Sequence, residues 1–297
     1  MDADVILDRR RLKRRLNFWR LTAALAVMAL IAVGVGKYYS HGETHIARLT
    51  ISGFITEDVE RGEAIDKLVK RKDVQAVIVR VNSPGGTTAG SEQIYHALRR
   101  VAAAKPVVAV IGTIGTSGGY IVAIAADHIV AMETSLTGSI GVLFQTAEFT
   151  GLMDKLGIKP FSLKSSPLKG QPSPVEPITE EVRQALQLLL EDSYDWFAGL
   201  VRERRKFDAA ALRRATDGRV FSGRQAVKLR LVDALGGERA ARRWLKDSHG
   251  ISMELPITDV RWGEDAGLVS RTLDTVGGKL FKNERLTLDG LLSVWQP

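Results

Sequence analysis

The pattern of apolar and polar positions divides the chain into two unlike parts. Near the N-terminus, residues 21–36 (LTAALAVMALIAVGVG) form a run of sixteen residues without a charge, with Phe18 and Trp19 just before it, separated from it only by Arg20. Together these residues approach the roughly 20 that a membrane-spanning helix requires. Beyond about residue 40, apolar positions come instead in short β-branched runs, each followed by a turn signal and then a helical pattern. This second part is typical of a folded domain.

Basic residues stand directly in front of the long apolar run. Residues 1–20 hold seven Lys or Arg against three Asp, a net charge of +4, which is half of the formal +8 of the chain. A basic flank followed by interfacial aromatic residues predicts a cytoplasmic arm over residues 1–17 and an uncleaved anchor over residues 18–37. A cleavable signal peptide is the nearer alternative, although no clear A-x-A site follows the run. A buried core helix would not need the basic cluster.

This topology also accounts for the basic arm without nucleic acid, so we expect no nucleic-acid partner. The residues beyond about 40 are then expected outside the cytoplasmic membrane of a bacterial cell. For a bacterium with two membranes, the prediction is a single-pass inner-membrane protein whose N-terminus is cytoplasmic and whose folded domain is periplasmic.

The second part reads as alternating strands and helices. Near-continuous apolar runs predict strands that are covered on both faces of a sheet; they are residues 47–55, 76–81, 107–112, 128–132 and a short fifth at 160–163. Helical patterns lie between them at residues 91–104 and 179–206. Thr179, followed by Glu180 and Glu181, is a good N-terminal cap for the second helix. The alternation predicts an α/β domain with crossover connections.

Two later segments lack this alternation. Residues 165–177 (SSPLKGQPSPVEP) contain four prolines among thirteen residues, which predicts an extended loop. The tail from about residue 248 has weak periodicity. Its last stretch, residues 286–295, is apolar enough to pack on another surface, such as a neighbouring subunit.

The inventory of reactive side chains is narrow. Cysteine is absent, which excludes a thiol nucleophile, disulfides and Cys-ligated metal sites. No histidine has metal-ligand spacing, so we expect neither a metal nor a cofactor. His41 and His45 are expected in solvent, His96 lies off the apolar stripe of its helix, and His128 opens a strand in a structural position. A Ser-His-Asp triad is therefore poorly supported.

Two glycine-rich segments remain as candidates for a catalytic or binding site: NSPGG at 82–86 and GTSGGY at 115–120. A serine followed by paired glycines at a strand-to-helix turn is sterically exposed, and the free N–H groups of the helix start lie next to it. This arrangement suits a nucleophile with an adjacent oxyanion site. A plain tight turn and a phosphate-binding turn are the alternatives, although no P-loop motif is present.

A nucleophilic Ser117 would need a base, and with histidine disfavoured the common choice is lysine. The proline-rich loop supplies two, Lys164 and Lys169. A lysine in water has a pKa of about 10.4, so burial or a local field must lower the pKa before the amine can accept a proton at neutral pH. The residues alone do not choose between the two lysines.

Several motifs together resemble signal peptide peptidase A in its short, single-domain bacterial form. The resemblance covers about residues 45–245. It is carried by five runs in the order and spacing of that family: VNSPGG (81–86), GTSGGYIVAIAADHIVA (115–131), LTGSIGV (136–142), LKSSPLKGQPSP (163–174) and GRVFSGRQAVKLRLVDALGG (218–237). The resemblance implies a membrane-anchored serine endopeptidase with a crotonase/Clp-protease-like α/β fold.

The resemblance also implies roles for individual residues. Ser117 matches the nucleophile of a Ser/Lys dyad, Lys169 rather than Lys164 matches the general base, and Ser139 matches the serine that orients the lysine. Gly86 and Gly118 match the backbone donors of the oxyanion hole. Residues 45–245 are then the peptidase domain, and residues 246–297 are a C-terminal extension that could contact another subunit.

The family forms rings or domes with inward-facing sites built from neighbouring subunits, and it cleaves remnant signal peptides and other membrane-proximal chains through an acyl-enzyme. The chain departs from the family at Gly115-Thr116, where alanine is frequent, and at Gly170, where an acidic residue is common. Neither departure removes a catalytic atom, but both could shift specificity. An acyl-CoA enzyme on the same fold and a non-catalytic membrane scaffold are the competing functions.

Overall fold

The computed structural model of the chain describes residues 15–29, 31, 43–262 and 292–294. The chain divides into two units, Met1–Thr44 and His45–Pro297. In the first unit, residues 15–29 are helical. Within the described ranges, no helix combines the length and the apolar character needed to cross a membrane. The predicted cytoplasmic arm up to residue 14, His41, and residues 30 and 32–37 of the predicted anchor lie outside these ranges.

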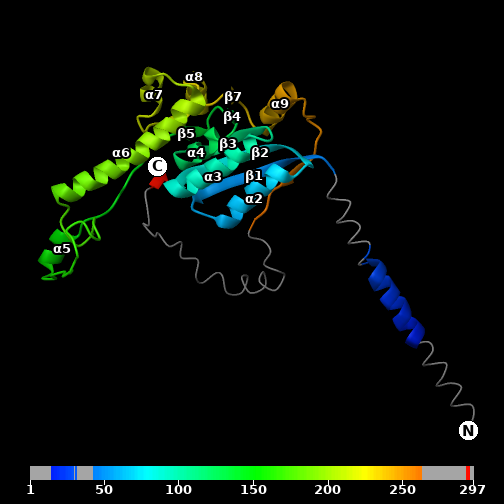
Figure 1. The fold of residues 1–297 in the computed structure, drawn as a ribbon, viewed down its shortest axis with the longest axis horizontal. Helices are drawn as coiled ribbons and strands as arrows, with labels where there is room; N and C mark the ends of the chain where they lie inside the picture. The colour runs from blue at the N-terminus through cyan, green and yellow to red at the C-terminus, as the bar shows by residue number, and fades with distance from the viewer. Residues whose placement is uncertain (1–14, 30, 32–42, 263–291, 295–297) are drawn as a thin grey trace, which may run out of the picture. The chain divides into compact units, whose positions relative to one another are not determined.

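The second unit is built on one twisted sheet, which holds the nine strands of the described residues (Figure 1). Its centre consists of three adjacent parallel strands, β1 (His45–Ile55), β2 (Val74–Thr87) and β3 (Val107–Thr116). Shorter strands extend it: β4 (His128–Ala131), β5 (Leu136–Gly138), β6 (Val220–Ser222), β7 (Ala234–Leu235), β8 (Ile257–Asp259) and β9 (Leu292–Val294). The predicted α/β class is confirmed.

Helices pack against both faces of the sheet, as the near-continuous apolar strands predict. The side chains of a strand alternate between faces, so Val77 and Val79 of β2 enter the larger core cluster while Ile78 enters the smaller one. The larger cluster is covered by α2 (Val59–Lys70), α3 (Thr88–Ala102), α4 (Gly118–Ile124) and α6 (Glu180–Arg205). The smaller one lies under α9 (Glu238–His249), and the remaining helices are α5 (Thr150–Lys155), α7 (Ala209–Ala215) and α8 (Gly223–Lys228).

The central strands run further than predicted. β2 continues to Thr87, so the predicted turn at 82–86 is extended chain that stays in register with the end of β1 after a bulge. β3 likewise continues to Thr116. Local turn signals are overridden here because the neighbouring strand offers backbone hydrogen-bond partners along the whole segment.

The other predicted ends of helices and loops lie close to the observed ones. α6 begins after Thr179, whose hydroxyl accepts a 3.3 Å hydrogen bond from the Val182 N–H, and it ends at the left-handed Lys206. The helix predicted at 91–104 begins three residues earlier, at Thr88. Residues 165–177 form a loop, as predicted, but the loop is not extended throughout, because turns lie at 167–170 and 174–175.

Two expectations are wrong. Residues 160–163 form no strand, because they lie in a segment with no sheet edge beside it. His45 is buried, not solvated: it opens β1, and its ring nitrogen lies 3.9 Å from the Asp73 carboxylate. The apolar tail, expected to pack on another surface, does so on its own chain where it is described, since β9 pairs with β2.

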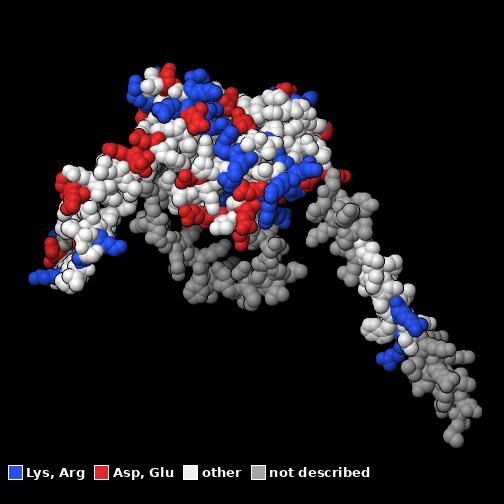
Figure 2. Space-filling view, in the orientation of Figure 1, with Lys and Arg blue, Asp and Glu red and all other residues white. Residues whose placement is uncertain are grey.

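Residues 144–178, which we call the arm, connect the sheet to α6 and contain α5. The arm and the first turns of α6 extend away from the sheet (Figure 1), and much of their surface carries neither charge (Figure 2). Phe161 and Leu163 of the arm are 90% and 92% exposed. Five more large apolar side chains there are also exposed: Phe149, Leu152, Leu156, Ile158 and Leu168. In one copy of the chain, the arm has no core of its own.

Candidate active site

Ser117 occupies a strained turn between β3 and α4. Its backbone has φ 53° and ψ −118°, a region that L side chains rarely adopt, and such a conformation costs about 1–3 kcal/mol. Its N–H donates to the Gly138 carbonyl oxygen at 2.8 Å. The strand-to-helix turn lies where the sequence motif predicts it. The predicted exposure is wrong, because only 1% of the residue is accessible in a single copy.

Gly118 and Gly119 open α4, and as its first residues their N–H groups have no preceding helical turn to donate to. A Cβ on Gly119 would lie 2.6 Å from the Ser83 carbonyl oxygen, so only glycine lets the helix start so close to β2. The hydroxyl of Thr116 donates to the Pro84 carbonyl oxygen at 3.1 Å. These contacts bring the two glycine-rich segments together, although they are about thirty residues apart in sequence.

Gly86 lies at the end of β2, beside Ile55 of β1. A Cβ at this position would meet the Ile55 carbonyl oxygen at 1.9 Å and the Ile55 nitrogen at 2.5 Å, so no other residue fits. Ser83 supports the same strand end: its hydroxyl donates to the Gly53 carbonyl oxygen at 2.6 Å, and the Gly85 N–H donates to that hydroxyl at 3.1 Å. The backbone around Gly86 is therefore held closely on both sides.

Ser139 follows Gly138, the acceptor of the Ser117 N–H. Ser139 is buried and also has a positive φ, 50°, and its N–H donates to the Arg219 carbonyl oxygen at 2.8 Å. Thr137, two residues before Ser139, also contacts β3: its hydroxyl donates to the Gly115 carbonyl oxygen at 2.9 Å. The structure thus brings Ser117, Ser139 and the start of α4 together at the ends of β3 and β5.

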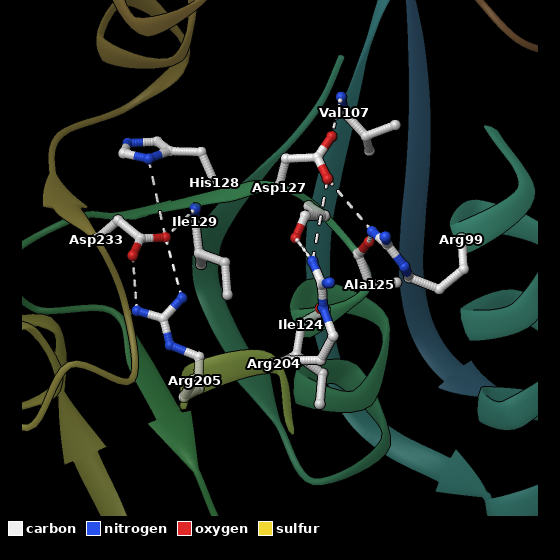
Figure 3. Close-up of polar contacts among 11 residues, drawn as sticks. Arg99, Val107, Ile124, Ala125, Asp127, His128, Ile129, Arg204, Arg205 and Asp233 are labelled. Carbon is white, nitrogen blue, oxygen red and sulfur yellow. Dashed lines mark hydrogen bonds and ion pairs between the residues drawn. The ribbon is translucent and has the colours of Figure 1, made fainter. Parts of the chain in front are cut away.

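Two arginines hold the other end of α4, and the sequence reasoning did not identify them. Arg204 donates to the carbonyl oxygens of Ile124 and Ala126, both at 2.9 Å, and Arg99 donates to that of Ala125 at 2.8 Å (Figure 3). Cations at a helix C-terminus satisfy carbonyl groups that lack intrahelical donors. Burial lowers the pKa of Arg204. The available signal was the run of arginines at the end of α6.

A second polar group ties β4 to the end of α6. The Asp233 carboxylate accepts hydrogen bonds from Arg205 at 2.7 Å and from the Ile129 N–H at 2.7 Å, and His128 lies 3.8 Å away (Figure 3). His128 also stacks on Trp244, with ring centroids 4.8 Å apart. The structural position expected for His128 is confirmed, because its ring packs between elements away from Ser117.

Lys169 lies in the arm and is exposed. The segment that carries it lies beside α5, at the end of α6 that points away from the sheet (Figure 1). The arm that carries Lys169 thus extends away from the sheet, whereas Ser117 directly follows β3 of that sheet. Lys164 is ion-paired with Glu176, whereas Lys169 forms no ion pair within the described part of the chain. Among the described residues, a carboxylate engages the amine of Lys164 but not that of Lys169.

The family assignment rests on comparison with known proteins. The model of peptidase family S49 matches residues 99–252. A protein of Synechocystis sp. named as a protease is 36% identical over 208 residues, which cover 69% of this chain and 75% of that protein. A protein of Enterococcus faecium named as signal peptide peptidase SppA is 34% identical over 183 residues, which cover 61% of this chain and 53% of that protein. The chain belongs to peptidase family S49.

The resemblance to signal peptide peptidase A is thereby confirmed, and so is the predicted class of enzyme, a serine endopeptidase. Among solved structures, a mutant of ClpP1 from Listeria monocytogenes superposes with a TM-score of 0.41 and 15% identity, covering 65% of this chain and 92% of that one.

Proposed function

We propose that the protein is a membrane-anchored peptidase in which Ser117 attacks the peptide bond and Lys169 is the general base. The observation that carries the proposal is the buried, strained turn of Ser117 at the start of α4, next to the closely held strand end at Gly86. A nucleophile there lies among backbone N–H groups that can receive a developing oxyanion. Ser139, the residue after the Gly138 acceptor, is proposed to orient the lysine.

A short extended segment beside β2 supports peptide binding. β9 pairs antiparallel with β2, so that Leu292, Ser293 and Val294 oppose Thr87, Gly86 and Gly85. The strand end at Gly86 therefore accepts a peptide strand through main-chain hydrogen bonds, which is a common mode of peptide recognition. A substrate in the same position would have its backbone beside one of the proposed oxyanion donors.

The reaction follows from these positions. The neutral Lys169 amine accepts the proton of the Ser117 hydroxyl as Oγ bonds to the substrate carbonyl carbon. The N–H groups of Gly86 and Gly118 stabilise the oxyanion, each donor by about 3 kcal/mol in comparable hydrolases. Lys169 then returns the proton to the leaving amine as the peptide bond breaks. Water attacks the acyl-enzyme, and its hydrolysis releases the second product and regenerates Ser117.

We propose that Lys169 reaches Ser117 of a neighbouring copy in a ring or dome of identical subunits. Its exposure in a single copy and the exposed apolar side chains of the arm support this arrangement. An apolar surface of this kind is stabilised when a partner covers it. Enclosure between copies would also remove water from around the amine, and desolvation favours the neutral form that a base requires.

The membrane anchor and the substrate complete the proposal. The basic residues before the apolar run of residues 21–36 support an N-terminus in the cytoplasm and a catalytic unit on the opposite side of the inner membrane. Substrates cleaved there would be remnant signal peptides and other polypeptides close to the membrane. The name of the Enterococcus faecium relative supports the same substrate class.

The test uses the full chain in detergent or nanodiscs with a fluorogenic peptide. Ser117→Ala and Lys169→Ala are each expected to abolish hydrolysis while leaving the assembly size unchanged. Lys159→Ala, which removes another exposed lysine of the arm, is the matched control and should retain activity. Mass spectrometry of a covalent serine-directed inhibitor should map the adduct to Ser117. Turnover near the wild-type rate in either Ala variant, or labelling of another serine, would contradict the proposal.

A further inference from the structure

One carboxylate organises the loop that carries Lys169. Glu176 accepts hydrogen bonds from the Ser162 hydroxyl, the Lys164 amine and the Gln171 side-chain amide. Ser162 and Lys164 precede Lys169 in sequence, whereas Gln171 follows it. These three hydrogen bonds, which we call the tie, therefore join the segments before and after Lys169 through a single side chain.

Within this tie, main-chain contacts shape the turn around Lys169. The Lys169 N–H donates to the Ser166 carbonyl oxygen at 3.1 Å, and the Gln171 N–H donates to that of Leu168 at 3.2 Å. The Gln171 side-chain oxygen also accepts a 3.0 Å hydrogen bond from the Ser173 N–H. Gln171 thus links the turn to Glu176 on one side and to the following chain on the other.

The tie is more sheltered than the rest of the loop. The side chains of Lys164 and Glu176 are 19% and 23% exposed, whereas Phe161 and Leu163 close by are at least nine-tenths exposed. The hydrogen bonds from Lys164, and then from Ser162, hold the pKa of Glu176 below its usual range. The carboxylate therefore stays ionised, and the tie persists, into mildly acidic solution.

We infer that Glu176 is a positioning residue for catalysis, which fixes the loop so that the Lys169 amine is presented in one orientation. The inference rests on the proposed function, because it takes Lys169 as the base. In a loop without helix, strand or core, these side-chain contacts add to the main-chain hydrogen bonds in restricting where the amine lies. A base that samples many positions spends little time in the reactive geometry, and a displacement of about 1 Å can reduce a rate by about 100-fold.

The structure also gives Lys164 a role that the sequence did not distinguish. Lys164 is the cation of the tie, because its amine donates to the Glu176 carboxylate. The two lysines of the loop therefore have different functions: Lys164 holds the loop, and Lys169 acts from it. The pair of Lys164 and Glu176 can be exchanged, which provides a direct test.

The experiment measures hydrolysis of the fluorogenic peptide by the assembled, full-length chain. Glu176→Gln is expected to lower kcat by about 10- to 100-fold and to leave KM within about 2-fold, because the substrate strand site is not changed. Glu176→Asp should recover most of the loss. Glu148→Gln is the matched control: Glu148 is another arm carboxylate that accepts a hydroxyl hydrogen bond, from Thr150, and its variant should keep normal kcat.

The charge exchange distinguishes positioning from general damage to the arm. Glu176→Lys alone should be nearly inactive, and adding Lys164→Glu should restore kcat by at least about 10-fold, since the ion pair is rebuilt in reverse. Normal kcat in Glu176→Gln, or no recovery in either Glu176→Asp or the exchanged pair, would overturn the inference. Lys169→Ala is measured in parallel. An active Lys169→Ala variant would refute the proposed function itself, whereas an inactive one with a normal Glu176→Gln would refute only the positioning role.

Discussion

The main-chain N–H of Ser117 donates a 2.8 Å hydrogen bond to the carbonyl oxygen of Gly138, the residue that immediately precedes Ser139. This bond joins two turns that both contain a serine with positive φ, 53° at Ser117 and 50° at Ser139. Residues in such conformations persist only where the surrounding structure holds them. Here the hydrogen bond and the sheet contact between β3 and β5 supply that support.

The strain at Ser117 predicts that a glycine at this position stabilises the fold. The free energy of unfolding of Ser117→Gly is expected to be about 1 kcal/mol higher than that of Ser117→Ala, because glycine adopts a positive φ without a Cβ penalty. Both variants lack the hydroxyl, so both should be inactive. Denaturant unfolding of the two variants checks the difference. Equal stability of the Gly and Ala variants would show that the turn is not strained.

A dyad formed between copies predicts complementation between two inactive variants. Ser117→Ala and Lys169→Ala, unfolded, mixed and reassembled together, should regain activity, because some interfaces then pair an intact serine with an intact lysine. For random equal mixing around a closed ring, about one quarter of the sites are complete. Peptide hydrolysis by the mixture measures this fraction.

In the control for complementation, Ser117→Ala is mixed with a chain that carries both Ser117→Ala and Lys169→Ala, instead of with Lys169→Ala. That mixture has no intact serine, so it should stay inactive. A mixture of the two single variants that assembles normally but gains no activity would mean that Lys169 serves the Ser117 of its own copy.

The pairing of β9 with β2 predicts that the C-terminal segment competes with substrate. A chain that ends at residue 291 lacks Leu292–Val294 and leaves the strand edge at Gly85–Thr87 open. Its KM for a short peptide should fall by about 3- to 10-fold with kcat unchanged, because a tethered segment is present at high effective concentration. Steady-state kinetics of the two chains checks this.

A synthetic peptide with the sequence of residues 290–297 serves as the complement to that truncation. It should inhibit the shortened chain competitively, and a peptide of the same composition in scrambled order should inhibit it less. An unchanged KM in the shortened chain would mean that β9 does not occupy the substrate position.

Stability is expected to depend on pH through His128. Burial lowers the pKa of His128, and this effect outweighs the opposite effect of Asp233; Arg205 acts in the same direction as burial. An unfolded histidine, with a pKa of about 6.5, therefore binds a proton at a higher pH than the folded one does. The free energy of unfolding should fall as the pH drops below about 6.5 and should level off below the folded pKa, with a slope of at most about 1.4 kcal/mol per pH unit.

Urea unfolding at pH 7.5 and pH 5.5 tests this dependence. His128→Phe keeps the aromatic stacking on Trp244 but cannot take up a proton, so it should reduce the loss of stability at low pH. His249, which also contacts the Trp244 ring, stays in place in this variant. His96→Gln, on the exposed surface of α3, is the control and should behave as wild type. The same pH dependence in His128→Phe and wild type would contradict the assignment.

Features that depend on neighbours in sequence were predictable. The runs that became β2, β3 and β4 are apolar at nearly every position, which is how strands covered on both faces appear. The cap at Thr179 and the end of the long helix near Lys206 follow from local hydrogen bonding. The serine turn at 117 was recognisable because paired glycines after a strand allow a helix to start close to another backbone.

Only the tertiary structure decided where distant segments meet. Turn signals at 82–86 gave way to extended chain because β1 supplies backbone partners there, and His45 is buried because Asp73 and the sheet surround it. The contacts of β9 with β2, of Arg204 with the end of α4, and of Glu176 with both limbs of its loop join residues through space. Composition and local pattern specify what a segment can form by itself, but its partner depends on which surfaces the whole chain leaves to be covered.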